Sequence, residues 1–501
     1  MSNDNLLPDK VGYTFIVDSF EDVIDPNDGV TTLREVINSA NGLAGQDTVV
    51  FNVVSGSEIK LSEQLNITDD LIINGSGAGN LTISGDGTFN NLFIDNANVV
   101  INGLTIANGH NGIDVGSNST LTVTNSAIVN NTDDGLQVSG DGNTLKVNNT
   151  TLAHNIGDGF DVNSNHNTIS FTGVSSIGNG EIGLEIDGTY NNVTVDSSYL
   201  ASNGDDGLKI DEGGNNTLKV TNTTLAHNIG DGFDVNSNHN TISFTGVSSI
   251  GNGEIGLEID GTYNNVTVDS SYLASNGDDG LKIDEGGNNT LKVTNTTLAH
   301  NSDDGLDVNS NGNTINLSGV SLTANGQDGL EIDGDRNLFT ISNSSFAGNG
   351  NDGIKFDQGD DNSVFVSNST IANNIGDGLD ILGNYNNVSL YGVGVNANGN
   401  DGVVLNGNFN SISASNSVFS NNVGDGFDVN GNNNIVGLLA INSFGNGQDG
   451  LEIDGNYNFL SVIGSTFSNN GGESIADRGL GNILNLSGNN ISGLESQPIL
   501  I

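Results

Sequence analysis

The sequence has no cysteine, no tryptophan, three prolines and only 11 lysines and arginines among its 501 residues. Without cysteine the chain can form neither a disulfide scaffold nor a thiolate zinc site, and it has no cysteine nucleophile. Its 61 acidic residues give a net charge of −50, which argues against binding to nucleic acid or to anionic membranes, because both require clustered basic residues. No apolar run approaches the roughly 18 residues that indicate a membrane-spanning helix.

The first ten residues, from Met1 to Lys10, lack the basic start and the apolar core of a secretory signal peptide. Three explanations of this absence are open. The protein stays inside the cell, leaves it by a route that needs no signal peptide, or is part of a longer chain.

A motif of the form Asn-x-x-x-Gly-apolar-x-apolar recurs fifteen times, mostly at intervals of 24 residues. Each interval contains three short runs in which apolar and polar residues alternate, the pattern of strands with one buried face. The runs are separated by Gly, Asn, Asp and Ser, which favour turns. These features predict an all-β, parallel β-helix solenoid with three strands per coil. We expect it to be right-handed, because parallel crossovers nearly always are.

The repeats also have a longer period. Residues 145–217 and 218–290 are the same 73-residue block with one difference, Asn148 against Thr221, and residues 291–363 are a looser third copy. One continuous β-helix is predicted from about residue 50 to residue 495. The expected regions are an N-terminal cap over residues 1–50, irregular first coils over 51–110, regular coils over 111–470, and a C-terminal coil and cap over 471–501.

Asparagine forms two regular rows. One row stands four residues before every repeat glycine, as at Asn131 and Asn155, and the second lies sixteen residues before the next glycine, as at Asn143 and Asn167. Stacked asparagines can bond both to their own turn and to the amides above and below. We therefore interpret both rows as structural ladders.

The N-terminal segment differs from the repeats. Thr32-Leu-Arg-Glu35 fits a capping box, and Leu33, Val36, Ile37 and Ala40 make one apolar helix face. A solenoid needs its open end covered. The pattern predicts a short capping helix near residues 32–40.

Residues 31–41, followed by strand-like runs at 47–52, 71–75 and 104–109, resemble the start of large bacterial exported or surface β-helix proteins. In that family an "SLREAI…AN" helix caps a right-handed parallel β-helix, and Thr32 stands where Ser or Cys is usual. The remainder is similar to the repeats of those proteins and, more distantly, to the β-helices of polysaccharide lyases and epimerases. The resemblance covers nearly the whole chain. It implies a protein found outside the cell or on its surface.

Acidic residues gather around the repeat glycine. Asp precedes it directly in 12 of 15 coils, an acidic residue follows two positions later in ten, and Asp follows four positions later in seven. Like charges stacked about 4.8 Å apart repel one another, and calcium would relieve this repulsion by accepting several carboxylate oxygens. Lysines at positions 209, 282 and 355 relieve part of it. The predicted calcium ligands are Asp158, Asp161, Asp187, Asp206, Asp211, Asp231, Asp234, Asp260, Asp279, Asp284, Asp304 and Asp307. The alternative is a solvated acidic face without bound metal.

The sequence points to no catalytic residue. Gly159-Phe-Asp-Val-Asn163 resembles the Gly-Phe-Asp-Pro-His motif of mannuronan epimerases, but Val162 and Asn163 replace Pro-His, so the catalytic histidine is missing from the match. An active site is one constellation, whereas these coils are nearly identical. The six histidines, of which four are duplicated pairs, are expected in exposed turns, and Tyr190 and Tyr263 are candidate sugar-stacking surfaces.

We therefore predict a non-catalytic exported or cell-surface rod of adhesin or matrix type. It would bind divalent cations, calcium above all, and a polysaccharide or cell-surface glycan as partner. The alternative is a carbohydrate-active enzyme, either a polysaccharide lyase or a uronan C-5 epimerase.

Overall fold

A computed structural model describes residues 12–492 of the chain. The chain divides into two compact units, one up to Thr241 and the other from Ile242 onward. Each unit is a parallel β-solenoid in which every coil contributes one strand to each of three sheets, here called A, B and C, with about 24 residues per coil. The predicted fold class is confirmed. The predicted cap residues 1–11 and 493–501 lie outside the described part.

Unit 1 opens with β1 (Thr14–Val17), α1 (Leu33–Ala40) and β2 (Asp47–Phe51), and β1 pairs in parallel with β2. The predicted capping box is present. Glu35 N–H donates to Thr32 Oγ1 over 3.2 Å, and Thr32 N–H donates to Glu35 Oε2 over 3.1 Å. Arg34 donates two hydrogen bonds of 2.8 Å to Asp22. The predicted helix therefore forms over nearly the predicted residues.

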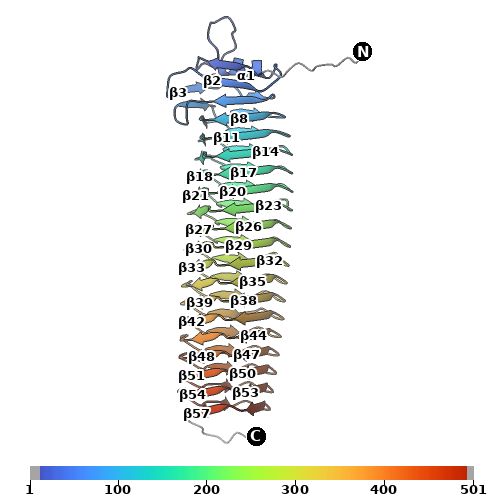
Figure 1. Cartoon of the computed structure of the whole chain (residues 1–501), viewed down its shortest axis with the longest axis vertical. Helices are drawn as coiled ribbons and strands as arrows, with labels where there is room; N and C mark the ends of the chain where they lie inside the picture. Colours follow the sequence, from blue (N-terminus) through green and yellow to red (C-terminus); the bar gives the residue numbers. More distant parts are fainter. Residues whose placement is uncertain (1–11, 493–501) are drawn as a thin grey trace, which may run out of the picture. The chain divides into compact units, whose positions relative to one another are not determined.

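Sheet A consists mainly of five-residue strands, whose second and fourth residues are buried where the predicted alternation places them. Figure 1 shows β8, β11, β14, β17 and β20 stacked side by side. After β1 and β2, its strands are β5 (Leu71–Asn74), β8 (Asn98–Asn102), β11 (Thr120–Thr124), β14 (Thr144–Asn148), β17 (Thr168–Thr172), β20 (Asn192–Asp196), β23 (Thr217–Thr221), β26 (Thr241–Thr245), β29 (Asn265–Asp269), β32 (Thr290–Thr294), β35 (Thr314–Ser318), β38 (Leu338–Ser342), β41 (Ser363–Ser367), β44 (Asn387–Tyr391), β47 (Ser411–Ser415), β50 (Ile435–Leu439), β53 (Phe459–Ile463) and β56 (Ile483–Ser487).

Sheet B consists of short strands, most with one buried apolar residue at the centre. Its strands are β3 (Ser57–Lys60), β6 (Leu81–Ser84), β9 (Thr105–Ala107), β12 (Ala127–Val129), β15 (Thr151–Ala153), β18 (Ser175–Ile177), β21 (Tyr199–Ala201), β24 (Thr224–Ala226), β27 (Ser248–Ile250), β30 (Tyr272–Ala274), β33 (Thr297–Ala299), β36 (Ser321–Thr323), β39 (Ser345–Ala347), β42 (Thr370–Ala372), β45 (Gly394–Asn396), β48 (Val418–Ser420), β51 (Asn442–Phe444), β54 (Thr466–Ser468) and β57 (Asn490–Ser492).

Sheet C consists of the short strands that follow the repeat glycines, with buried apolar residues on either side of a central one that points outward. Its strands are β4 (Leu65–Ile67), β7 (Leu92–Ile94), β10 (Ile113–Val115), β13 (Leu136–Val138), β16 (Phe160–Val162), β19 (Leu184–Ile186), β22 (Leu208–Ile210), β25 (Phe233–Val235), β28 (Leu257–Ile259), β31 (Leu281–Ile283), β34 (Leu306–Val308), β37 (Leu330–Ile332), β40 (Ile354–Phe356), β43 (Leu379–Ile381), β46 (Val403–Leu405), β49 (Phe427–Val429), β52 (Glu452–Ile453) and β55 (Ala476–Asp477).

Both predicted asparagine ladders form. The backbone N–H and the Nδ2 of Asn131 donate to Asn155 Oδ1 over 3.1 and 2.8 Å, and Asn155 donates in the same way to Asn179. In the second ladder, Asn143 N–H donates to Asn167 Oδ1 over 2.8 Å. These amides are buried, so each satisfies a turn that water does not reach.

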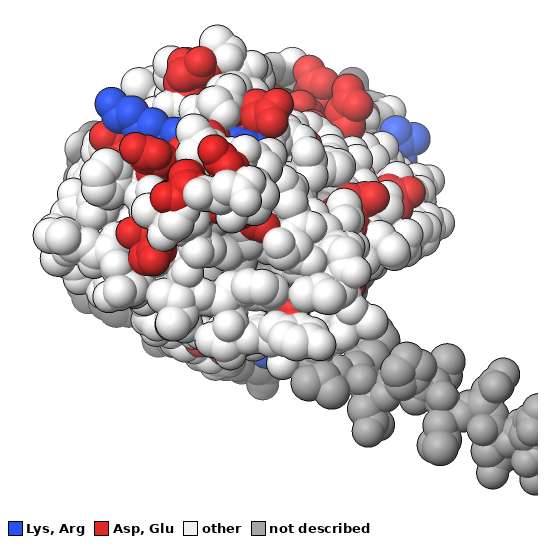
Figure 2. All heavy atoms as spheres, turned by 90° about the horizontal axis from the view of Figure 1, so that it is seen from above, with Lys and Arg blue, Asp and Glu red and all other residues white. Residues whose placement is uncertain are grey.

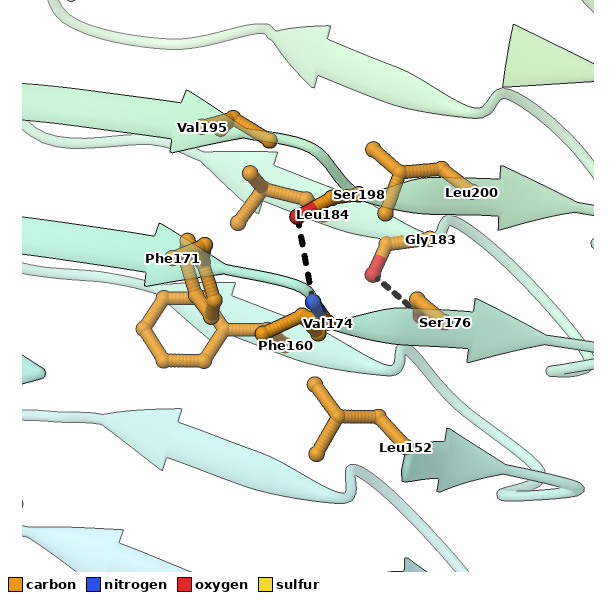
Figure 3. A pocket seen from close by; sticks show the side chains of 10 residues that line it. All are labelled: Leu152, Phe160, Phe171, Val174, Ser176, Gly183, Leu184, Val195, Ser198 and Leu200. Carbon is orange, nitrogen blue, oxygen red and sulfur yellow. Dashed lines mark hydrogen bonds between the residues drawn. The ribbon is translucent and has the colours of Figure 1, made fainter. Parts of the chain in front are cut away.

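The interior of unit 1 is filled by side chains. A cavity of about 10 Å³ in this unit is lined mainly by apolar side chains, among them Leu152, Phe160 and Leu184 (Figure 3). At its edge Ser176 Oγ donates to the carbonyl oxygen of Gly183 over 2.8 Å. A void of this size holds about one water at most. The cavity therefore offers no room for a ligand.

The structure contains, within residues 12–492, no helix long and apolar enough to cross a membrane.

Replacing Asn155 by Leu should lower the free energy of unfolding by about 1–3 kcal/mol for each buried group left unpaired, because Asn131 loses its acceptor. Urea denaturation measures the effect. The neighbouring His154 is exposed and has a φ of 57°, so His154→Asn, which suits that backbone, should stay within about 0.5 kcal/mol. Equal losses in the two variants would contradict the ladder.

Candidate cation-binding site

The outer side of sheet C carries the acidic residues that the repeats predict. The central residue of each strand points outward, and the residue before the repeat glycine lies just ahead of the strand. Figure 2 looks at the molecule from above, where Asp and Glu gather in clusters and Lys and Arg are few. On sheet C the central residues of successive strands are register partners, as Asp161 and Glu185 are, so side chains from neighbouring coils meet there.

The aspartates before the repeat glycine form a third ladder, which sequence analysis did not foresee. Asp158 N–H donates to Asp134 Oδ1 over 2.9 Å, and Ile182 N–H donates to Asp158 Oδ1 over 2.7 Å. In unit 2, Asp328 N–H donates in the same way to Asp304 Oδ1 over 2.6 Å. One carboxylate oxygen of each Asp is thus a structural acceptor, and the other, Oδ2, is left for the outer face.

Two carboxylates of this ladder converge in unit 1 with a third from a strand of sheet C. Asp134, Asp158 and Asp161 offer oxygen atoms that all lie within 4.8 Å of one another. Their side chains are nearly inaccessible, with 5, 3 and 4% of the residue exposed. Asp161 Oδ2 accepts from Gln137 Nε2 over 3.3 Å and from Asn163 Nδ2 over 2.5 Å, whereas Asp161 Oδ1 is buried without any hydrogen-bond partner.

Burial raises the pKa values of this cluster. The pKa of Asp158 rises to about 10, because burial and the neighbouring carboxylate of Glu185 both disfavour its charge. Burial followed by the charge of Asp134 raises the pKa of Asp161 to about 8. Burial likewise raises the pKa of Asp134 to about 6. Among the described residues, no Lys or Arg forms an ion pair with these three carboxylates.

In other coils, lysine stands two residues after the repeat glycine, at the position that Gln137 has in the coil of Asp134. Lys209 Nζ lies 3.4 Å from Asp206 Oδ2 and 3.1 Å from Asp234 Oδ2. In unit 2, Lys282 Nζ lies 3.7 Å from the Oδ2 atoms of both Asp279 and Asp307. The ammonium group thus approaches the oxygens that the aspartate ladder leaves unused.

The structure brings together only part of the predicted ligand set. Asp158, Asp206, Asp279 and Asp304 are ladder residues whose Oδ1 atoms are already engaged. The remaining predicted ligands divide by burial. Asp161, Asp231, Asp234 and Asp307 are buried, whereas Asp187, Asp211, Asp260 and Asp284 are half-buried just beyond the ends of their strands.

Several members of the acidic clusters were missed as ligands, namely Asp134, Glu185, Glu258, Asp278 and Asp303. Asp134 belongs to the main cluster, and Glu185 groups with Asp161 and Asp187 within 4.8 Å. Asp134 could have been found from its place directly before Gly135, in the same row as Asp158. The signal for Glu185 is its position two residues after Gly183, which matches that of Asp161 after Gly159.

The histidines lie where the repeat pattern places them. All six are exposed, and five of them have a positive φ in the turns. Tyr190 stacks on His166 with ring centroids 5.2 Å apart and remains 57% exposed. In Gly159-Phe-Asp-Val-Asn163, Phe160 and Val162 are buried, whereas Asn163 is exposed and donates to Asp161.

The family described as "Right handed beta helix region" matches residues 182–338, 285–444 and 328–491, together more than half of the chain. This chain belongs to the right-handed β-helix family. The handedness expected from the repeats is thereby confirmed. No curated protein matches the sequence of this β-helix protein.

Several solved structures are similar to this β-helix protein at low identity. Bacteriophage phi29 gene product 12 is 12% identical, with 92% of this chain and 71% of that chain covered and a TM-score of 0.39. A periplasmic alginate epimerase is 12% identical, covering 64% and 77%, with a TM-score of 0.35. A mannuronic acid-specific family 6 polysaccharide lyase from human gut microbiota is 13% identical, covering 76% and 87%, with a TM-score of 0.34.

Without bound metal, the stability of the protein should fall as the pH rises. The raised pKa values mean that Asp161, Glu185 and Asp134 hold protons in the folded chain at pH values where the unfolded chain has released them. Their stabilisation is complete below about pH 4, and that of Asp161 is lost as the pH passes about 8. Each proton contributes a slope of up to about 1.4 kcal/mol per pH unit.

Urea denaturation in EDTA from pH 4 to pH 8.5 measures this slope. Asp161→Asn should make it shallower, because an amide does not titrate. Asp141→Asn is the matched control, since Asp141 is exposed and Asn165 occupies its position in the next coil. A wild-type slope in Asp161→Asn would contradict a proton on Asp161.

Proposed function

We propose that this protein is a non-catalytic β-helix that binds divalent cations, calcium above all, on the outer face of sheet C. The observation that carries the proposal is the cluster of Asp134, Asp158 and Asp161, whose oxygens lie within 4.8 Å of one another. Asp161 Oδ1 is buried in this cluster without a partner. A buried, unpartnered carboxylate oxygen is costly, and a bound cation removes that cost.

Calcium fits this donor set better than other divalent ions. The cluster offers only oxygen ligands, and it contains neither cysteine nor histidine, which zinc prefers. Calcium also accepts irregular geometry and retains water ligands, whereas magnesium demands a near-ideal octahedron. Sites that must displace protons from carboxyls of raised pKa bind weakly at neutral pH.

A place outside the cell or on its surface belongs to the same proposal. Calcium modules outside cells work with dissociation constants of about 10⁻⁴ to 10⁻³ M, the weak range that protonated carboxyls favour. A glycan partner is also proposed. Many equivalent contacts along a repetitive surface, including exposed rings such as Tyr190, would sum through multivalency.

A non-catalytic role is supported by the repetition itself. Cleavage or epimerisation of a uronan needs a base together with a group that neutralises the sugar carboxylate. The duplicated coils present the same side chains several times, and the histidines lie exposed in turns. Within the duplicated blocks each base and each cation recurs, and an arginine beside carboxylates occurs outside them, where Arg478 pairs with Asp449 and Asp454.

Added calcium should raise the melting temperature of the full chain. The gain follows mass action and reaches about 2.7 kcal/mol per site at a free concentration roughly one hundred times the dissociation constant. Sodium chloride at the same ionic strength should stabilise less, because it only screens the repulsion. Differential scanning fluorimetry after treatment with EDTA measures both effects.

Two variants sharpen the calcium test. Asp161→Asn should reduce the calcium-dependent shift, whereas Asp141→Asn, which removes the same charge from an exposed turn, should preserve it. If sodium chloride stabilises as much as calcium, the acidic rows are a screened surface and the cation proposal is wrong.

The full chain should show no turnover of alginate, pectate or similar acidic polysaccharides. A net charge of −50 repels polyanions unless cations bridge them, and the repeated coils offer no separate acid–base set. Incubation with each polymer, with and without calcium, followed by assays for unsaturated products and for a changed uronate composition, tests this. Activity that disappears when residues 218–290 are deleted would establish the enzymatic alternative.

A further inference from the structure

The carboxylate cluster of unit 1 occupies the same sequence positions as four other sets of three aspartates, and all five sets are here called triads. Each triad contains the Asp before the repeat glycine in two successive coils and the Asp two residues after the second glycine. In every triad the second Asp donates its backbone N–H to Oδ1 of the first, over 2.5 to 2.9 Å. The triads are Asp134–Asp158–Asp161 and Asp206–Asp231–Asp234 in unit 1, and Asp279–Asp304–Asp307, Asp352–Asp377–Asp380 and Asp401–Asp425–Asp428 in unit 2.

The triads differ at one position, the residue two after the first glycine, here called the switch position. Its strand pairing is the same in all five, because it lies in register with the third Asp of the triad. It is lysine in three triads and an uncharged residue in two. The switch residues, in the order of the triads above, are Gln137, Lys209, Lys282, Lys355 and Val404.

The lysines act as cations that the chain itself supplies. Lys209 and Lys282 each place Nζ within 4 Å of Oδ2 of the first and third Asp of their own triad. Lys355 donates to Glu331 over 2.7 Å and lies 3.8 Å from Asp328 Oδ2, on the coil before. Among the described residues Lys355 forms no ion pair with Asp352, Asp377 or Asp380, but its charge acts on Asp380, where it works against the rise in pKa that burial causes.

The two triads without lysine lack this charge. Gln137 gives Asp161 one weak hydrogen bond of 3.3 Å, and Val404 has no polar group to offer Asp428. Asp428 is 7% exposed, and its Oδ1 atom is buried without a partner, as in Asp161. Asp307 Oδ1, in a triad with lysine, is also buried without a partner, so the triads differ in the charge of the switch residue and not in this oxygen. Among the described residues no ion pair reaches Asp401, Asp425 or Asp428.

We infer that the divalent-cation sites of this protein are the two triads with an uncharged switch residue, one in each unit, and that lysine at the switch position closes the other three. This inference rests on the proposed function. An ammonium group at the switch position repels an incoming cation at short range. In the triads of Lys209 and Lys282 it also pairs with the Oδ2 atoms of the first and third Asp, which a cation would need. Cation binding is thereby confined to discrete sites rather than spread along the whole acidic face.

Calcium stoichiometry on the full chain tests the inference, because the chain supplies its own conservative exchanges. Wild type should bind two calcium ions in equilibrium dialysis at physiological ionic strength. Gln137→Lys should bind one, since lysine already occupies that position in the coil of Lys209. Lys282→Gln should bind three, since glutamine already occupies that position in the coil of Gln137.

Matched controls change the same charges elsewhere. Lys219→Gln and Thr194→Lys lie on the outer side of sheet A, where residues 194 and 219 are register partners, so Thr194→Lys introduces the residue that the next coil already has. Both control variants should bind two calcium ions. Cooperative thermal unfolding establishes that each variant is folded before its stoichiometry is compared.

The outcomes separate the inference from the proposed function. If wild type binds calcium but neither Gln137→Lys nor Lys282→Gln changes the number of sites, the switch position is wrong and the proposed function stands. If wild type binds no calcium, the proposed function fails and the inference fails with it. Equal changes in the sheet A controls would show that overall charge, not the switch position, sets the stoichiometry.

Discussion

Each side chain of this protein stacks on the side chain at the same position one coil away, and this register constrains everything else. A residue type is tolerated in a row only if copies of it satisfy one another. Asparagine does so, because its amide donates to the next copy and accepts from the previous one, as Asn131, Asn155 and Asn179 show. Aspartate does so only in part, because one oxygen can accept a backbone N–H while the other brings a like charge close to the next.

The aspartate ladder therefore stabilises the turns through hydrogen bonds and at the same time brings like charges close together. Its Oδ1 atoms accept hydrogen bonds from backbone N–H groups of the next coil, which would otherwise be buried without a partner. This explains why a carboxylate lies in a buried turn. The unused oxygens then need protons or cations. Lys209 and Lys282 supply the cation from within the chain, whereas burial raises the pKa values of Asp158 and Asp161 and so favours their protonated forms. The repulsion between carboxylates is thus reduced by lysine in some coils and by protonation in others.

The fold could be predicted almost completely from three features of the sequence. The repeats have a period of about 24 residues, apolar and polar residues alternate within each strand, and Thr32 and Glu35 have the spacing of a capping box. The candidate site could be predicted only as rows. Sequence periodicity shows that Asp recurs before the glycine, but not that its Oδ1 turns inward to a backbone N–H of the next coil. For that reason Asp206 and Asp279 were expected as free ligands, Asp134 was not proposed, and the unpartnered oxygen of Asp161 had no signal at all.

In a chain of near copies, a singular site can arise only where a copy departs from its neighbours. Residues 145–217 and 218–290 differ at one position, so neither block by itself can hold a singular site. Gln137 and Val404 lie outside both blocks, in coils where the sequence of Asp, Glu and Lys two residues after the glycine is interrupted. The duplicated blocks repeat lysine two residues after the glycine, whereas the uncharged switch residues stand in the flanking coils. Under the proposed function, regular repetition supplies the frame of carboxylates, and the irregular coils are where that frame would be open to a cation.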